Sequence, residues 1–260
     1  MRRSIILTII LLSLTLIPLF SDQKGEELAK KYFDLKDSND TRSDASMVLI
    51  DGNGNKKIRK LEMFTMEGKE GKNSFIRFIE PADVKNTKLL TLSHKNSDNE
   101  QMLFLPAMKK TRRISSSSKD GEFVGSDFYY YDLEDREFED YTYKFIKGDD
   151  TVNSESYKNM KFNVIEMTAK DSNCPYSRSL AWINNSDNFI YKMEVYDKKD
   201  DKLLKTIFFL DVKKIDGILI PQKTVMMNHK KGSKTLLQLD NLEVNKGLSE
   251  SIFTVQNLEK

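Results

Sequence analysis

The beginning of the chain is its most apolar stretch. Two arginines precede an apolar run over residues 5–20, and polar sequence follows from Asp22. A positive segment, a short apolar segment and a small residue, here Ser21, are typical of a secretory signal peptide. A retained membrane anchor is the alternative, but a spanning helix needs roughly 20 apolar residues. We therefore expect residues 1–21 to be a cleaved signal peptide that directs residues 22–260 to the periplasm.

Beyond this run, the spacing of apolar positions changes from helical to alternating. Residues 26–33 carry apolar side chains at helical spacing, with Glu in the first turn and Lys later, and predict one helix. After it, short apolar segments bounded by Gly, Asn, Asp and Pro predict a series of strands, typical of a β-barrel or sandwich. The predicted strands cover residues 46–50, 58–66, 74–80, 88–93, 101–105, 141–147, 161–168, 177–183, 189–196, 203–212, 218–227 and 234–244.

Several predicted strands are apolar on both faces instead of alternating. Residues 75–79, 88–92, 102–105 and 207–210 are examples. An antiparallel sheet with one face in water alternates between apolar and polar residues, so both faces of these strands are expected to meet apolar partners. On the concave face the partner is either the protein's own helix and loops or a bound ligand. Core burial alone explains most apolar residues.

Length and charge narrow the class of protein. All-β barrels and sandwiches often reach this length as one unit, and no long Pro-, Gly- or Ser-rich linker divides the chain. We therefore expect a single domain over residues 22–260. Lys and Arg number 42 and Asp and Glu 40, which gives a net charge of +2. Removal of Arg2 and Arg3 with the expected signal peptide leaves 40 basic and 40 acidic residues, so the chain lacks the electrostatic footprint of a nucleic-acid-binding protein.

Residues that usually carry catalysis are few. The single cysteine, Cys174, cannot form an internal disulfide, and we expect it to be buried, as free cysteines usually are. The histidines, His94 and His229, lie in polar sequence. No H-E-x-x-H, G-x-S-x-G, P-loop or dinucleotide-binding glycine motif occurs. We therefore expect a protein that is not an enzyme and needs no cofactor or metal ion.

The most distinctive segment covers residues 104–133. It contains a Leu-Pro pair that ends at Pro106, the run Arg-Arg-Ile at 112–114 and the run Phe-Val-Gly-Ser-Asp at 123–127. Pro106 is expected to end a strand. The Gly-Ser-Asp part is typical of a turn or helix cap, because Ser and Asp side chains accept backbone N–H bonds.

This combination of motifs resembles the periplasmic outer-membrane lipoprotein-sorting family, the relatives of the lipoprotein carrier LolA. Within that family the chain is similar to the branch encoded near resistance-nodulation-division (RND) transporters, which carries the three motifs in this order. Matching elements extend from Phe78-x-x-Pro81 to Phe253-Thr254, so the resemblance covers nearly all of residues 22–260. It implies a mostly β fold, namely a half-open, highly curved antiparallel β-barrel with a few helices plugging its concave face.

The resemblance also implies a function. We expect a periplasmic carrier that holds the acyl chains of a lipid or lipoprotein in an apolar cavity, transfers them towards the outer membrane and touches membranes only transiently. The alternative is a non-catalytic periplasmic adaptor of an inner-membrane RND-type transporter. Which residues line the cavity depends on strand register, because a slip of one residue moves each side chain to the opposite face of the sheet. The residues expected to line the cavity are Phe64, Phe78, Leu90, Leu92, Leu103, Leu105, Trp182, Met193 and Phe208.

Two interpretations apply to the motif residues Pro106, Arg112, Arg113, Gly125, Ser126 and Asp127. In the structural interpretation, one of the arginines pairs with Asp127 or Asp132 and pins the central loop, because a buried charge normally needs a partner. In the functional interpretation, an arginine contacts an anionic headgroup or a partner protein. We favour the structural interpretation.

Overall fold

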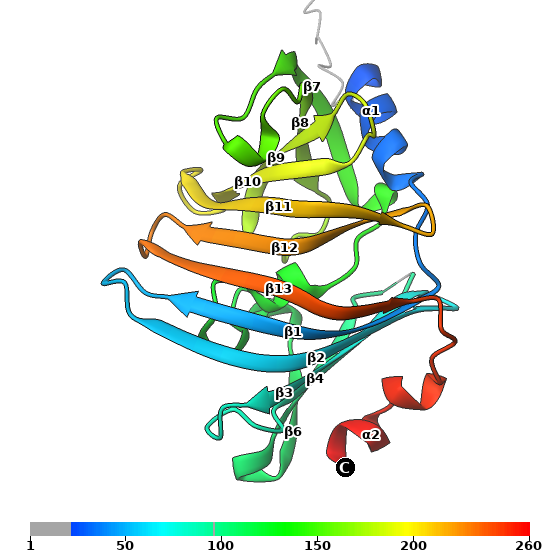
Figure 1. Cartoon of the computed structure of the whole chain (residues 1–260), viewed down its shortest axis with the longest axis vertical. Coiled ribbons are helices and arrows are strands. Elements are labelled where there is room, and N and C mark those ends of the chain that lie inside the picture. Colours follow the sequence, from blue (N-terminus) through cyan, green and yellow to red (C-terminus); the bar gives the residue numbers. More distant parts are fainter. Residues whose placement is uncertain (1–21, 96) are drawn as a thin grey trace, which may run out of the picture.

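A computed structural model describes residues 22–95 and 97–260, so the expected signal peptide lies outside the described residues. One antiparallel sheet of 13 strands organises the chain (Figure 1). The strands are β1 (Asp40–Ile50), β2 (Lys56–Gly68), β3 (Gly71–Glu80), β4 (Lys88–Leu92), β5 (Glu100–Leu105), β6 (Lys110–Ile114), β7 (Tyr141–Asp150), β8 (Phe162–Ala169), β9 (Tyr176–Asn184), β10 (Ile190–Asp197), β11 (Leu203–Ile215), β12 (Ile218–Asn228) and β13 (Ser233–Val244).

Helices are short and few in this part of the chain. The α-helices are α1 (Gln23–Phe33) and α2 (Val255–Glu259). None of the helices within the described residues has the length and apolar character needed to cross a membrane. The 3₁₀ turns are η1 (Pro106–Met108), η2 (Ser116–Ser118), η3 (Phe123–Gly125), η4 (Tyr130–Leu133), η5 (Phe138–Asp140), η6 (Glu155–Tyr157) and η7 (Glu250–Phe253).

Local sequence signals explain the first elements. Asp22 caps α1 by accepting a hydrogen bond from the Lys24 N–H at 3.0 Å. At the β1–β2 turn, the Asp51 carboxylate accepts the N–H groups of Asn53 and Asn55, each at 2.9 Å, and Gly54 adopts a positive φ of 85°. The predicted helix and all the predicted strands are present, with shifted ends. The prediction lacked β6 and α2.

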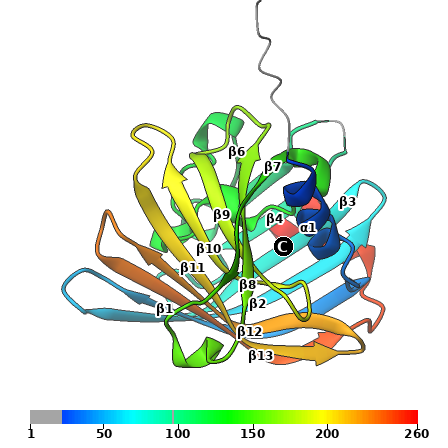
Figure 2. The ribbon, with the colours of Figure 1, turned by 90° about the horizontal axis from the view of Figure 1, so that it is seen from above.

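The first and the last strand of the chain are neighbours in the middle of the sheet. The order is β6-β5-β4-β3-β2-β1-β13-β12-β11-β10-β9-β8-β7, so the first and last strands pair with each other. The edge strands β6 and β7 are consecutive in sequence, and residues 115–140 join them. This connection, here called the central segment, lies inside the curve of the sheet (Figure 2). The predicted fold class, a mostly β chain with an open, highly curved antiparallel sheet, is confirmed.

The concave face of the sheet is filled mainly by the central segment. Phe123, Phe128 and Tyr131 of this segment join one core cluster with residues from both halves of the sheet, such as Phe78 and Ile207. Helix α1 packs on β7 to β9 through Leu28 and Ala29. The expected plug of helices is therefore made of one α-helix and, for its larger part, a loop with short 3₁₀ turns.

The outer face is also covered, which explains why several strands are apolar on both sides. Phe253 and Leu258, from η7 and α2, pack on Phe75, Leu90 and Met102 of β3 to β5. Farther along the sheet, the β7–β8 connection covers β8 to β11 with a second aromatic cluster. The two-faced pattern therefore reflects two layers of the protein's own residues.

Candidate apolar binding site

An apolar cavity of about 200 Å³ lies between the concave face and the central segment. For scale, an apolar cavity of about 150 Å³ holds one benzene molecule. The site therefore has room for only a short piece of an acyl chain while the central segment is in place. The apolar side chains around it include Met167, Met193, Ile207, Phe209 and Met226 from the sheet and Phe128 and Tyr131 from the central segment.

Cys174 lines the same cavity. Its side chain is buried, as the sequence predicted. Burial raises the pKa of the Cys174 thiol above its ordinary value, so little reactive thiolate forms near neutral pH. Cys174 is thus a protected thiol beside the site, and its exposure reports on the position of the central segment.

One anchor of the central segment is the buried carboxylate of Asp127. Ser233 Oγ donates to Asp127 Oδ1 at 2.5 Å, and Thr235 Oγ1 donates to Asp127 Oδ2 at 2.8 Å. Just before it, the Phe-Val-Gly-Ser run forms a tight turn, in which Gly125 has a φ of 72° and the Phe123 N–H donates to the Phe128 carbonyl at 2.7 Å. The motif therefore fastens the central segment to β13.

Replacing Asp127 with alanine is expected to lower the free energy of unfolding by about 2–3 kcal/mol, because hydrogen bonds to a charged group are lost. Urea denaturation measures the change. Asp120→Ala is the control: Asp120 lies in the same segment but is exposed, and we expect a change within about 0.5 kcal/mol. Unchanged stability of the Asp127 variant would contradict the anchoring role.

A second anchor is an ion pair on the concave face. Lys205 of β11 has a fully buried side chain, and its Nζ lies 2.9 Å from Asp132 Oδ2 of the central segment. Lys205 Nζ also lies 2.9 Å from the Tyr176 hydroxyl, which donates to Asp132 Oδ1 at 2.6 Å. The Lys205 ammonium sits over the Tyr129 ring, 3.2 Å from its centroid. Burial lowers the pKa of Lys205, and the Asp132 carboxylate opposes that shift.

Two further sheet residues bond the backbone of the central segment. The buried Arg59 guanidinium of β2 donates to the Val124 carbonyl. Gln101 Nε2 of β5 donates to the Tyr130 carbonyl at 2.9 Å. These contacts come from the half of the sheet opposite Lys205, so the central segment is held from both sides.

The predicted pairing of the motif arginines was wrong. Arg112 and Arg113 are exposed on the edge strand β6, and Arg113 lies 3.5 Å from Glu100. Asp127 and Asp132 have the β13 hydroxyls and Lys205 as partners instead. Adjacent residues of a strand point to opposite faces, and both arginine side chains extend into solvent from this edge strand, so neither pairs with Asp127 or Asp132. The other motif residues turn the chain: Pro106 begins η1, and Ser126 Oγ accepts the Phe128 N–H at 3.3 Å.

The predicted cavity residues divide between the two faces of the sheet. Phe78, Leu103, Leu105 and Met193 lie on the concave face, and Met193 lines the apolar cavity; their contact with lipid stays a prediction. The concave placement was wrong for the remaining residues, because adjacent residues of a strand point to opposite faces. On the outer face lie Phe64, Leu90 and Leu92, near α2, and Trp182 and Phe208, in the aromatic cluster.

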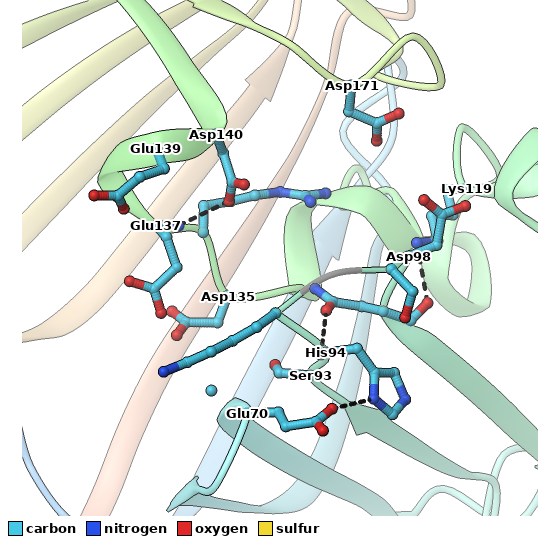
Figure 3. A pocket seen from close by; sticks show the side chains of 15 residues that line it. Glu70, Ser93, His94, Asp98, Lys119, Asp135, Glu137, Glu139, Asp140 and Asp171 are labelled. Carbon is cyan, nitrogen blue, oxygen red and sulfur yellow. Dashed lines mark hydrogen bonds and ion pairs between the residues drawn. The ribbon is translucent and has the colours of Figure 1, made fainter.

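A larger cavity of about 470 Å³ is lined by polar and charged residues from both ends of the central segment and from the neighbouring loops, and acidic side chains are the most numerous among them (Figure 3). His94 of the β4–β5 loop bonds Glu70 there at 2.8 Å, while Asp135 and Glu137 approach from the central segment. Among the described residues, no group of three or more His, Cys, Asp or Glu could hold a metal ion. Charged walls disfavour an acyl chain, so this cavity lies outside the apolar site.

Solved structures with the same fold show which class of protein this chain belongs to. A LolA superfamily protein from Nitrosomonas europaea shares the fold with a TM-score of 0.69 and 20% identity, over 90% of this chain and 98% of that one. A domain from Vibrio parahaemolyticus, assigned to outer membrane lipoprotein sorting, is 30% identical with a TM-score of 0.83, over 91% of this chain and 99% of that one. The chain therefore belongs to the outer membrane lipoprotein-sorting family.

A further solved structure is similar to the chain to the same degree. A DUF1329 family protein from Desulfovibrio piger is 30% identical with a TM-score of 0.82, over 90% of this chain and 98% of that one. A family model described as that of an uncharacterized protein matches residues 70–260. A search of curated proteins finds no match.

Proposed function

We propose that the protein is a periplasmic carrier that binds the acyl chains of a lipid or lipoprotein on the concave face of its sheet and transfers them towards the outer membrane without catalysis. The apolar cavity between this face and the central segment supports the proposal most directly. Family membership and the expected signal peptide agree with it. Methionines among the lining residues, such as Met167, Met193 and Met226, suit a site that adapts to chains of different shape.

The small size of the apolar cavity implies that a long acyl chain must displace part of the central segment to bind. Burying each CH₂ group contributes about 0.8 kcal/mol, so a long chain binds tightly if it finds enough apolar surface. A cavity of about 200 Å³ is too small for such a chain. The central segment covers much of the remaining concave face, including Leu61, Phe78 and Leu89. Acyl chains and the central segment therefore compete for the same surface.

Native mass spectrometry, with lipid extraction, tests the proposal on protein purified from the periplasm and on protein incubated with phospholipid vesicles. We expect bound lipid and, with it, faster alkylation of Cys174, because the displaced segment uncovers that thiol. A charge placed on the concave face by Met193→Lys is expected to abolish lipid binding. The matched control is Met227→Lys on the outer face, where Met227 is 38% exposed, and this variant is expected to bind lipid normally.

The carrier function is contradicted if the wild-type protein stays free of lipid in both preparations. A non-catalytic adaptor of an RND-type transporter would then be the better description. Equal lipid binding by the two methionine variants would instead show that lipid binds elsewhere. Melting curves of both variants establish that each is folded.

A further inference from the structure

The partner of the buried Lys205 is provided by the segment that cargo must displace. Lys205 belongs to the sheet, and its side chain has no exposed surface, whereas Asp132 belongs to the central segment. Tyr176, which shares the Asp132 carboxylate with Lys205, also belongs to the sheet. This inference rests on the proposed function, in which Lys205 and Tyr176 remain on the sheet when the central segment moves away.

The vacated position is an apolar surface with a positive charge in it. Val195 and Ile207 flank Lys205 on the same face of the sheet, Val195 as its directly paired neighbour in β10, and its paired neighbour in β12 is the uncharged Asn228. A charge in such surroundings is unfavourable unless an opposite charge pairs with it. Arg59, which the segment engages through the Val124 carbonyl, adds a second cation to the concave face. Opening is therefore favoured by a cargo that brings its own anion.

We propose that the cargo carries an anionic headgroup, a phosphate or carboxylate, that replaces Asp132 at Lys205 Nζ and the Tyr176 hydroxyl. Asp132 then acts as an internal substitute for the headgroup in the closed protein. The acyl chains lie on the apolar surface that the central segment uncovers, next to the headgroup. The preferred cargo is accordingly a lipid of net negative charge rather than a zwitterionic or uncharged one.

Competition between two lipids with identical acyl chains tests this proposal. The protein is incubated with vesicles of equal parts phosphatidylglycerol and phosphatidylcholine, and bound lipid is identified by native mass spectrometry. We expect the wild-type protein to prefer phosphatidylglycerol about tenfold, as befits a hydrogen bond to a charged group. In the double variant Lys205→Met with Asp132→Asn, which removes both charges with little change in shape, we expect the preference to disappear.

Two controls accompany this experiment. Lys88 is a similarly buried lysine that bonds the Leu258 carbonyl of α2 at 3.1 Å, and Lys88→Met is expected to keep the preference. If the double variant does not fold, Tyr176→Phe removes only one hydroxyl and is expected to reduce the preference about threefold. Inorganic phosphate alone is expected not to displace bound phosphatidylglycerol; displacement would assign the site to a free anion and overturn the lipid proposal.

The outcomes separate this inference from the function on which it rests. A wild-type protein that binds both lipids equally overturns the anionic preference and leaves the carrier function standing. The same holds if the double variant or, in its place, Tyr176→Phe keeps the full preference. A wild-type protein that binds neither lipid overturns the carrier function and this inference together.

Discussion

Replacing Phe123 with alanine is expected to lower the free energy of unfolding by about 3–5 kcal/mol, the usual cost of deleting a buried phenyl ring. Phe123 has no exposed surface although it belongs to a connecting loop. Its ring centroid lies 5.5 Å from that of Phe78 on the sheet and 6.0 Å from that of Tyr130. Urea denaturation followed by circular dichroism measures the loss.

The control for Phe123 is Met108→Ala, since Met108 is 56% exposed at the β5–β6 connection and an exposed substitution changes stability by about 0.5 kcal/mol or less. A loss below about 1 kcal/mol for the Phe123 variant would mean that the central segment packs loosely on the sheet and is not part of the core.

The proposed competition between the central segment and cargo for the concave face also predicts an effect of Phe123 on lipid uptake. The Phe123 variant is expected to take up lipid faster than the wild type.

The second large effect is expected from Asp132→Ala. This change leaves the Lys205 ammonium buried without its carboxylate, and breaking a buried ion pair in this way costs about 3–5 kcal/mol. It also removes the acceptor of the Tyr129 N–H, which lies 2.8 Å from Asp132 Oδ2. Chemical denaturation of the single variant and of the double variant Lys205→Met with Asp132→Asn gives the comparison.

The double variant is expected to recover most of that stability, because replacing both charges by neutral groups of similar size is often neutral. Its asparagine keeps an oxygen that can accept the Tyr129 N–H. An equally large loss in the single and double variants would show that the packing of Asp132, rather than the charge of Lys205, sets the cost.

The strands were predictable because their apolar segments and turn residues are local signals. The Asp51–Asn55 turn and β1 with β2 are examples: the Asp51 carboxylate closes the turn with bonds inside five residues. Strand β6 escaped prediction because it is a short edge strand whose exposed positions carry lysine and arginine, as edge strands often do. Helix α2 is short and is held by packing on β3 to β5, which no local pattern reveals.

Local sequence signals do not show which face of the sheet a strand residue occupies, or which residues anchor the central segment. Leu89 and Leu90 are both buried, one under the central segment and the other under α2, so their hydrophobicity does not distinguish the faces. The partners of Asp132 come from β9 and β11, far away in sequence. A single signal was present: Lys205 lies between the apolar pairs Leu203-Leu204 and Ile207-Phe208, with only Thr206 as a polar neighbour, and a charge among buried apolar residues indicates a buried partner.

The pairing of the first strand with the last has a consequence for folding. Strands β1 to β6 form a continuous antiparallel series. The other edge of β1 stays unpaired until β13, the last strand in the sequence, is available. Contacts between distant parts of a chain form slowly, and an unpaired apolar edge is prone to aggregate. A chain that lacks its last strands therefore exposes the edge of β1 in the middle of the sheet, so we expect truncation before β13 to promote aggregation.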